Sequence, residues 1–192
     1  MGAMGNVGVL LVNTLGGLYL LAVMLRFLLQ VARADFYNPF TQAIVKVTDP
    51  AVRFFRRIVP GYRGLVFASL VLALLVQCVC TALLISFSGF GIPGAGLVVS
   101  WSVIGLLSLV LNIYFWGMMI SIIASFIAPY SGHPALVLIR QLTEPLMEPF
   151  RRFLPSMGGL DLSPIFVFLA IQIIRTVLIM PMGVNPAVVL GL

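Results

Sequence analysis

The fold of this chain is decided by a basic, proline-bracketed stretch that occurs twice. Residues 48–60 read TDPAVRFFRRIVP, and residues 143–155 read TEPLMEPFRRFLP. Aligning position 48 with position 143 sets a shift of 95 residues, which pairs the stretches without gaps. The paired motif positions are Thr48 with Thr143, Asp49 with Glu144, Pro50 with Pro145, and Pro60 with Pro155. The chain is therefore predicted to be a tandem duplication of one structural unit.

The composition predicts that most of the chain lies in lipid. Of the 192 residues, 61% are hydrophobic and only 8% are charged, with a mean hydropathy of +1.18. A soluble domain carries about 25% charged residues. Because this chain has too few polar side chains to cover a water-facing surface, we expect a membrane protein.

Four apolar stretches are long enough to cross a bilayer, which takes about 20 residues in a helix. They cover residues 7–31, 65–87, 101–127 and 162–180. The shift assigns residues 1–87 to a first repeat and 97–192 to a second, joined by a glycine-rich linker at 88–96. Two spans per unit insert both units in the same direction. The expected fold is an all-α membrane protein with four transmembrane helices in two parallel tandem repeats.

The distribution of charge predicts the orientation in the membrane. The net charge is +6, and the cations outside the spans lie between spans one and two and between spans three and four. The linker and both ends of the chain carry no Lys or Arg. By the positive-inside rule, both basic segments face the cytoplasm and both termini face outward. We expect the cations to contact anionic lipid headgroups, and not nucleic acid.

Each basic segment is predicted to be an amphipathic, broken helix that lies in the headgroup layer. The two segments are residues 39–60 and 134–155. In the first, apolar and basic side chains take opposite sides at a helical period. Asn38 and Asp49 each precede a proline, which is typical of N-caps. We therefore expect two short helices with a break near Thr48–Asp49, and a less regular second copy because Pro149 interrupts it.

Two pairs of neighbouring arginines lie near the ends of these segments. They are Arg56 and Arg57 in the first copy, and Arg151 and Arg152 in the second. The planar guanidinium group suits contacts with phosphate. Three roles stay open at this point: fixing the membrane topology, docking a partner membrane protein, or binding anionic lipid headgroups.

A few polar residues are predicted at membrane depth. Arg175 lies well inside the fourth span, where an arginine costs at least about 2.5–3.5 kcal/mol and normally faces the protein interior. We expect it to belong to a buried polar layer formed by Gln77, Asn112, Gln172 and Arg175. This layer either holds the helices together through hydrogen bonds, or it forms part of an ion path or of a contact with a span of a partner protein. Arg26 lies near the cytoplasmic end of its span and can snorkel, so it needs no special role.

Residues that could support chemistry are scarce. His133, the single histidine, stands before Pro134, where an N-cap role is as plausible as haem ligation. The sequence has no glycine-rich phosphate loop and no His, Cys or Glu set at metal-ligand spacing. We expect neither an enzyme nor a resident cofactor or metal.

A family resemblance rests on two long motifs. NPFTQAIVKVTDPAVRFFRRIVP begins at Asn38, and TEPLMEPFRRFLPSMGGLDLSPIFVFL begins at Thr143. Together they resemble the YggT/YlmG family of small membrane proteins over nearly the whole chain. The second copy also matches through Asp161, Ser163 and Pro164, a portion that the first copy lacks. The resemblance implies an inner-membrane location and no established enzymatic activity.

Three functions follow from these observations and from the resemblance. The first is a non-enzymatic scaffold or assembly factor that acts through the basic amphipathic helices, with a homo-oligomer or another membrane protein as partner. The resemblance links bacterial relatives to osmotic tolerance and potassium uptake, which raises a small oligomeric ion channel as the alternative. It links plastid relatives to haem attachment and nucleoid partitioning, so a cytochrome assembly helper is the third.

Overall fold

The computed structural model describes residues 3–59, 67–89, 94–128, 130–153, 163–184 and 186–191. Within these residues the chain is helical and contains no strand. The α-helices are α1 (Ala3–Leu11), α2 (Gly17–Val31), α3 (Pro39–Arg56), α4 (Phe67–Ser88), α5 (Ala95–Ile127), α6 (Pro134–Phe153) and α7 (Ser163–Ile174). The expectation of an all-α protein is confirmed.

Four helices are long and apolar enough to cross a membrane, as the sequence predicts. They are Met4–Val31, Phe67–Ser88, Ala95–Ile127 and Ser163–Met182. The first joins α1 and α2 through a π-helical turn at Val12–Gly16, and the fourth extends α7 through another at Arg175–Ile179. The third span starts earlier than expected and has 33 residues, about 50 Å of helix. That length exceeds the hydrocarbon thickness, so this helix must tilt or extend into the interface.

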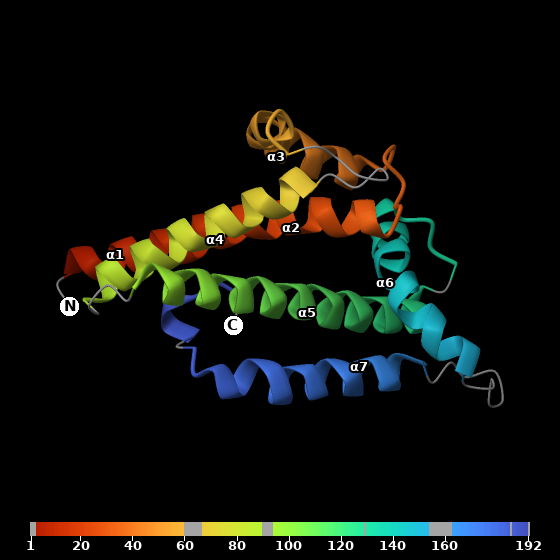
Figure 1. Cartoon of the computed structure of the whole chain (residues 1–192). Coiled ribbons are helices and arrows are strands. Elements are labelled where there is room, and N and C mark those ends of the chain that lie inside the picture. The colour runs from red at the N-terminus through yellow and green to blue at the C-terminus, as the bar shows by residue number, and fades with distance from the viewer. Residues whose placement is uncertain are drawn as a thin grey trace.

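The spans are unequally packed. Helix α4 packs against α1, α2 and α5, and Figure 1 shows α7 running along the side of α5 that faces away from these helices. One core of apolar side chains joins α2, α4 and α5, and a smaller core joins α5, α6 and α7. In the most apolar part of each span, 39% of the residues are buried in α4 and in α5. The buried share is only 17% in the first span and in the fourth span. The fourth span therefore leaves most of its surface available to lipid or to another helix.

The first amphipathic segment forms one helix, so the predicted break near Thr48–Asp49 is wrong. Helix α3 continues through Pro50 to Arg56. The hydroxyl of Thr48 donates to the carbonyl of Ile44 at 2.7 Å, one turn before it. Such back-bonding accommodates a bend in a helix, and it takes up a carbonyl next to the turn where proline supplies no N–H. Asp49 is not an N-cap, because its carboxylate pairs with arginines as described below.

The second segment follows the same design, and its predicted interruption is also wrong. Helix α6 runs unbroken through Pro145 and Pro149. At the position equivalent to Thr48, the hydroxyl of Thr143 donates to the carbonyl of Ile139 at 3.0 Å. Both threonines are fully buried and each lies two residues before its proline. A buried Thr with a back-bonded hydroxyl is thus the shared device that carries a helix through the T-[DE]-P motif.

The starts of these two helices meet. Asn38 caps α3 as predicted, since its side-chain oxygen accepts from the N–H of Phe40 at 2.9 Å. Its amide nitrogen donates to the carbonyl of Pro134, the first residue of α6, at 2.7 Å. His133 takes the cap position of α6, where Nδ1 accepts from the N–H of Ala135 at 3.3 Å. The equivalent ends of the two basic segments are therefore joined to one another.

The C-terminal segment folds back into the protein beside α4 and α5 (Figure 1). The side chains of Val188, Val189 and Leu190 are almost completely buried. The Gln77 amide donates to the carbonyl of Leu190 at 3.0 Å, and the Asn112 amide donates to the carbonyl of Gly191 at 2.8 Å. Irregular backbone at membrane depth is tolerated only where the protein supplies such partners. The tail is too short to span, as expected, yet it fills space between the spans.

Gly105 makes room for this tail. A Cβ atom added there would lie 2.3 Å from the Val189 side chain and 3.0 Å from the Leu190 carbonyl. Gly96, in the first turn of the same helix, has open space around its Cα. Gly105 and Gly96, two of the three glycines of α5, thus form a matched pair: packing requires the first, and the second has open space.

We predict that Gly105→Ala destabilises the protein although alanine favours a helix. Overpacking at a closed site costs about 1–3 kcal/mol, more than the gain of up to about 1 kcal/mol from helix propensity. Gly96→Ala should leave the stability unchanged or raised. Denaturant unfolding in detergent micelles, followed by tryptophan fluorescence, measures both. Equal stability of the two variants would contradict the observed packing of the tail.

Candidate functional site

The most constrained polar group of the chain is Arg26, which fixes α3 to α2. The residue is only 5% exposed. Its guanidinium donates to the hydroxyl of Thr48 at 3.0 Å and to the carboxylate of Asp49 at 3.1 Å. A longer contact of 3.5 Å reaches the carbonyl of Val45. One buried cation therefore binds three groups on a single turn of α3, at the T-[DE]-P motif.

The carboxylate of Asp49 joins Arg26 to a second arginine. Arg53, one turn further along α3, contacts it at 2.5 Å, and the Asp49 side chain is 20% exposed. Burial alone would raise the pKa of Asp49, but the hydrogen bond from Arg26 and the charges of Arg53 and Arg26 outweigh it. The net effect is a pKa below the ordinary value of 3.8. Asp49 is therefore ionised near neutral pH and neutralises the buried guanidinium.

The interpretation of Arg26 as a residue without a special role is wrong. It does not snorkel to water, because α3 folds over it and supplies the acceptors. Its pairing with a residue 23 positions away depends on how α3 lies across α2, which periodicity does not reveal. The signal available in the sequence was the acid at position 49, close to the cytoplasmic end of the span that contains Arg26.

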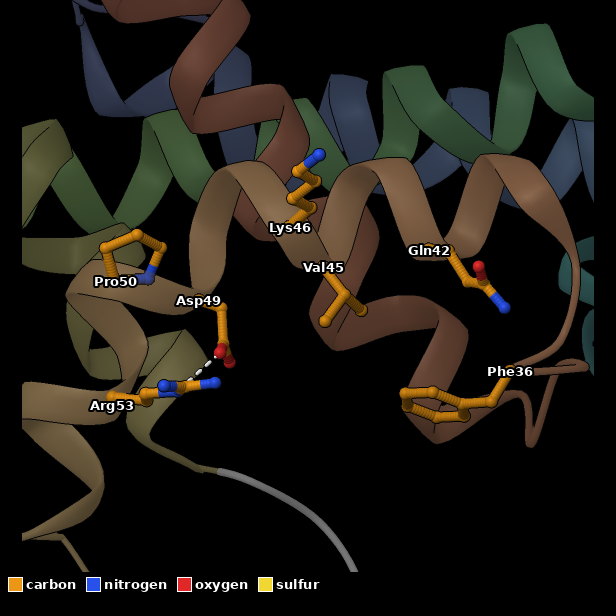
Figure 2. A pocket seen from close by; sticks show the side chains of 7 residues that line it. All are labelled: Phe36, Gln42, Val45, Lys46, Asp49, Pro50 and Arg53. Carbon is orange, nitrogen blue, oxygen red and sulfur yellow. Dashed lines mark ion pairs between the residues drawn. The ribbon is translucent and has the colours of Figure 1, made fainter.

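An open hollow of about 600 Å³ lies over the polar side of α3 (Figure 2). It is lined by Phe36, Gln42, Val45, Lys46, Asp49, Pro50 and Arg53. Figure 2 shows Arg53 turned onto Asp49, while Lys46 extends from the helix without a partner among the side chains drawn. The hollow is thus the place where the polar side of α3 meets the solvent or the headgroup layer.

The four predicted contact arginines divide into two kinds. Arg56 and Arg57 are exposed, and no ion pair engages either of them within the described ranges. In the second copy, Arg151 pairs with Glu144, and Arg152 pairs with Glu148 at 2.5 Å. The second pair is therefore largely neutralised by its own helix, whereas the first has no counter-charge among the described residues.

An exposed apolar stripe accompanies the cations of α3. The stripe consists of Phe40, Val47, Phe54 and Ile58, which are between 45% and 66% exposed. At 100° per residue these positions fall on one line, between the packed side of the helix and its basic side. An apolar stripe next to cations is the pattern of a helix that lies at the membrane surface.

The predicted polar layer is formed in part. Arg175 donates to the side-chain oxygen of Asn112, and its guanidinium carbon lies 6.0 Å from the centre of the Phe115 ring. Gln77 is fully buried and bonds the C-terminal segment, as Asn112 does. Gln172 does not join them, because it lies on the exposed side of α7. The sequence did not predict that the C-terminal segment joins this layer, where its carbonyls accept from Gln77 and Asn112.

The remaining motif positions are structural where they are described. Ser163 is buried at the first residue of α7, and Pro164 follows it in the first turn. Pro60, Pro155 and Asp161 lie outside the described residues. His133 caps α6 with Nδ1, and haem ligation by this residue stays a prediction. Within the described part of the chain, no group of three or more His, Cys, Asp or Glu residues could hold a metal ion.

Four membrane-length helices and two docked basic helices define a small multi-pass helical membrane protein. The family model CCB3/YggT matches residues 6–87 and again residues 100–182. The chain belongs to the CCB3/YggT family.

Similar bacterial proteins align with this chain over most of their length. An uncharacterised protein of Pseudomonas aeruginosa is 47% identical over 177 residues, which cover 92% of this chain and 90% of the relative. An uncharacterised Vibrio alginolyticus protein is 38% identical, with coverage of 84% and 88%. Uncharacterized protein YggT of Escherichia coli K12 is 36% identical, with coverage of 86% and 85%. No solved structure matches the chain significantly.

We predict that Asp49→Asn destabilises the protein far more than Glu144→Gln at the equivalent position. The first change leaves the buried Arg26 without a counter-charge, a loss of about 3–5 kcal/mol for a buried pair. The second breaks a pair whose side chains are 42% and 50% exposed, which is worth about 1 kcal/mol at most. Unfolding in micelles at neutral pH measures both. Similar losses for the two variants would contradict the assigned role of Arg26.

The contribution of Asp49 to the stability of the folded protein should be present at neutral pH and lost in strong acid. Since its folded-state pKa is lowered, the stabilisation is complete above the ordinary value of 3.8 and is lost as pH falls through the lower folded value. Wild type and Asp49→Asn should therefore differ at neutral pH and converge only in strong acid. Unfolding midpoints across this range provide the measurement. Convergence already above about pH 5 would contradict the pairing.

Proposed function

We propose that this protein is a non-enzymatic accessory protein of the bacterial inner membrane, a scaffold or assembly factor. It acts through the basic side of α3, with both basic segments in the cytoplasm and both termini outside. The two repeats insert in parallel, so that α3 and α6 reach the same membrane surface. The family resemblance connects this role with osmotic-stress tolerance.

The observation that carries the proposal is the difference between the two arginine pairs. Arg56 and Arg57 are exposed and unpaired within the described residues, whereas Arg151 and Arg152 are held by Glu144 and Glu148. Unpaired cations next to an exposed apolar stripe suit a helix at the membrane surface, and they also leave charge that can pair with acidic side chains of another protein. The arrangement fits an acidic surface on a partner protein, with the stripe resting in the headgroup layer.

A pore through a single chain is supported less well. Two residues of the mid-membrane layer, Gln77 and Asn112, already bond the C-terminal segment. Val188, Val189 and Leu190 fill the adjoining space with apolar side chains. A polar layer used in this way stabilises the fold, so we favour the accessory role over the channel.

We predict that Arg56→Gln combined with Arg57→Gln weakens partner capture by up to about 30-fold. Each exposed ion pair is worth up to about 1 kcal/mol, and about 1.4 kcal/mol corresponds to tenfold. Crosslinking in native membranes, followed by affinity isolation and quantitative mass spectrometry, measures the capture. Reversal of both residues to Glu should abolish it while insertion of the four spans is retained.

The matched control is Arg151→Gln combined with Arg152→Gln. These residues lie at the equivalent positions but are paired within their own helix. Their replacement should change the capture less than about twofold. Undiminished capture after the Arg56 and Arg57 reversal, in a correctly inserted protein, would overturn the proposed function.

A further inference from the structure

Arg175 carries a charge at membrane depth that no described residue neutralises. Among the described residues it bonds the neutral side chain of Asn112 and lies over the Phe115 ring. Its Nε is buried and has no hydrogen-bond partner. Asn112 is itself engaged with the carbonyl of Gly191. A guanidinium in such a place normally finds an acid, and no described carboxylate supplies one.

The same part of α7 presents further polar groups outward. Gln172 and Thr176, which flank Arg175, are both exposed. The fourth span is one of the two least packed in the chain. Gln172 and Thr176 lie one turn apart on the exposed side of the fourth span, and the half-buried Arg175 lies beside them with its guanidinium toward α5. We call these three residues the polar stripe; exposed apolar side chains such as Leu169 and Ile173 surround it. Lipid tails offer these groups no hydrogen bonds.

A second copy of the chain cannot supply the missing acid side chain. The sequence has five acidic residues, and all lie outside the four spans. They are Asp35, Asp49, Glu144, Glu148 and Asp161. A carboxylate side chain at the depth of Arg175 must therefore come from a different protein.

We propose that the polar stripe of α7 is the docking site for a transmembrane helix of another protein, which carries an Asp or Glu at the depth of Arg175. The carboxylate receives the guanidinium, Gln172 and Thr176 bond the same helix, and Leu169 and Ile173 pack against its apolar side chains. This inference rests on the proposed accessory role and identifies the chemical kind of partner. It uses a surface inside the membrane, separate from the arginines of α3.

The test places a photoreactive residue beside the stripe in the full-length protein, as Leu169→p-benzoylphenylalanine, and irradiates native membranes. We expect one adduct with a membrane protein that has a carboxylate inside a span. Arg175→Leu should reduce the adduct by at least about tenfold, because a desolvated charge pair is lost. Arg175→Lys should retain part of it. Neutralising the carboxylate of the captured protein should abolish the adduct. Replacing that acid by Arg and combining it with Arg175→Glu should restore the adduct, because the two charges are then exchanged.

The controls separate this inference from a folding defect and from the proposed function. Leu75→p-benzoylphenylalanine on α4 reports a second exposed position, and its products should not change with Arg175→Leu. Adducts at 169 that contain only second copies or lipid, or that persist in Arg175→Leu, would overturn the inference. If capture still depends on Arg56 and Arg57 in that case, the proposed function stands without the α7 site. If the adduct at 169 fails these tests and capture no longer depends on Arg56 and Arg57, both proposals are wrong.

Discussion

The structure depends on one buried guanidinium, that of Arg26. An arginine inside an apolar span is costly unless its charge and hydrogen bonds are met. Helix α3 meets the charge with Asp49, and Thr48, Asp49 and a carbonyl accept from the two terminal guanidinium nitrogens, while Nε has no partner among the described residues. We call the contacts of Arg26 with Thr48 and Asp49 the Arg26 clamp. This clamp holds α3 against the spans, although the cations of α3 favour water. In the first copy, each polar residue of the T-[DE]-P motif has a role: Thr48 accepts from Arg26 and donates to its own helix, and Asp49 neutralises the charge.

The second repeat keeps the motif but not the clamp. Thr143 back-bonds like Thr48, yet position 121, which the repeat aligns with Arg26, holds a serine. Glu144 is then free to pair with Arg151 on its own helix. A second difference adds to this one, since Glu148, the partner of Arg152, aligns with Arg53 of the first copy. These two differences leave Arg56 and Arg57 without an ion pair among the described residues, whereas Arg151 and Arg152 are paired within their own helix.

The sequence predicts what depends on local pattern. Hydropathy locates the four spans to within a few residues, except that α5 begins earlier, and Asn38 is recognisable as a cap because it precedes a proline. The breaks expected at prolines are wrong, because both helices continue through Pro50, Pro145 and Pro149. The partners of Arg26 and the buried tail were missed because they are long-range contacts. Gln172 was misplaced because its spacing from Arg175 does not show which side of a weakly packed span is covered.

The central claim is that Arg26 and Asp49 act as one unit that fixes α3 to α2. A double-mutant cycle with Arg26→Gln, Asp49→Asn and the combined variant, measured by unfolding in micelles at neutral pH, tests it most directly. Residues in one buried network couple by about 0.5–3 kcal/mol, and the account predicts a value in the upper half of that range. The double variant should then lose less stability than the sum of the two single losses, by that amount. Additive losses, with a coupling near zero, would contradict the account.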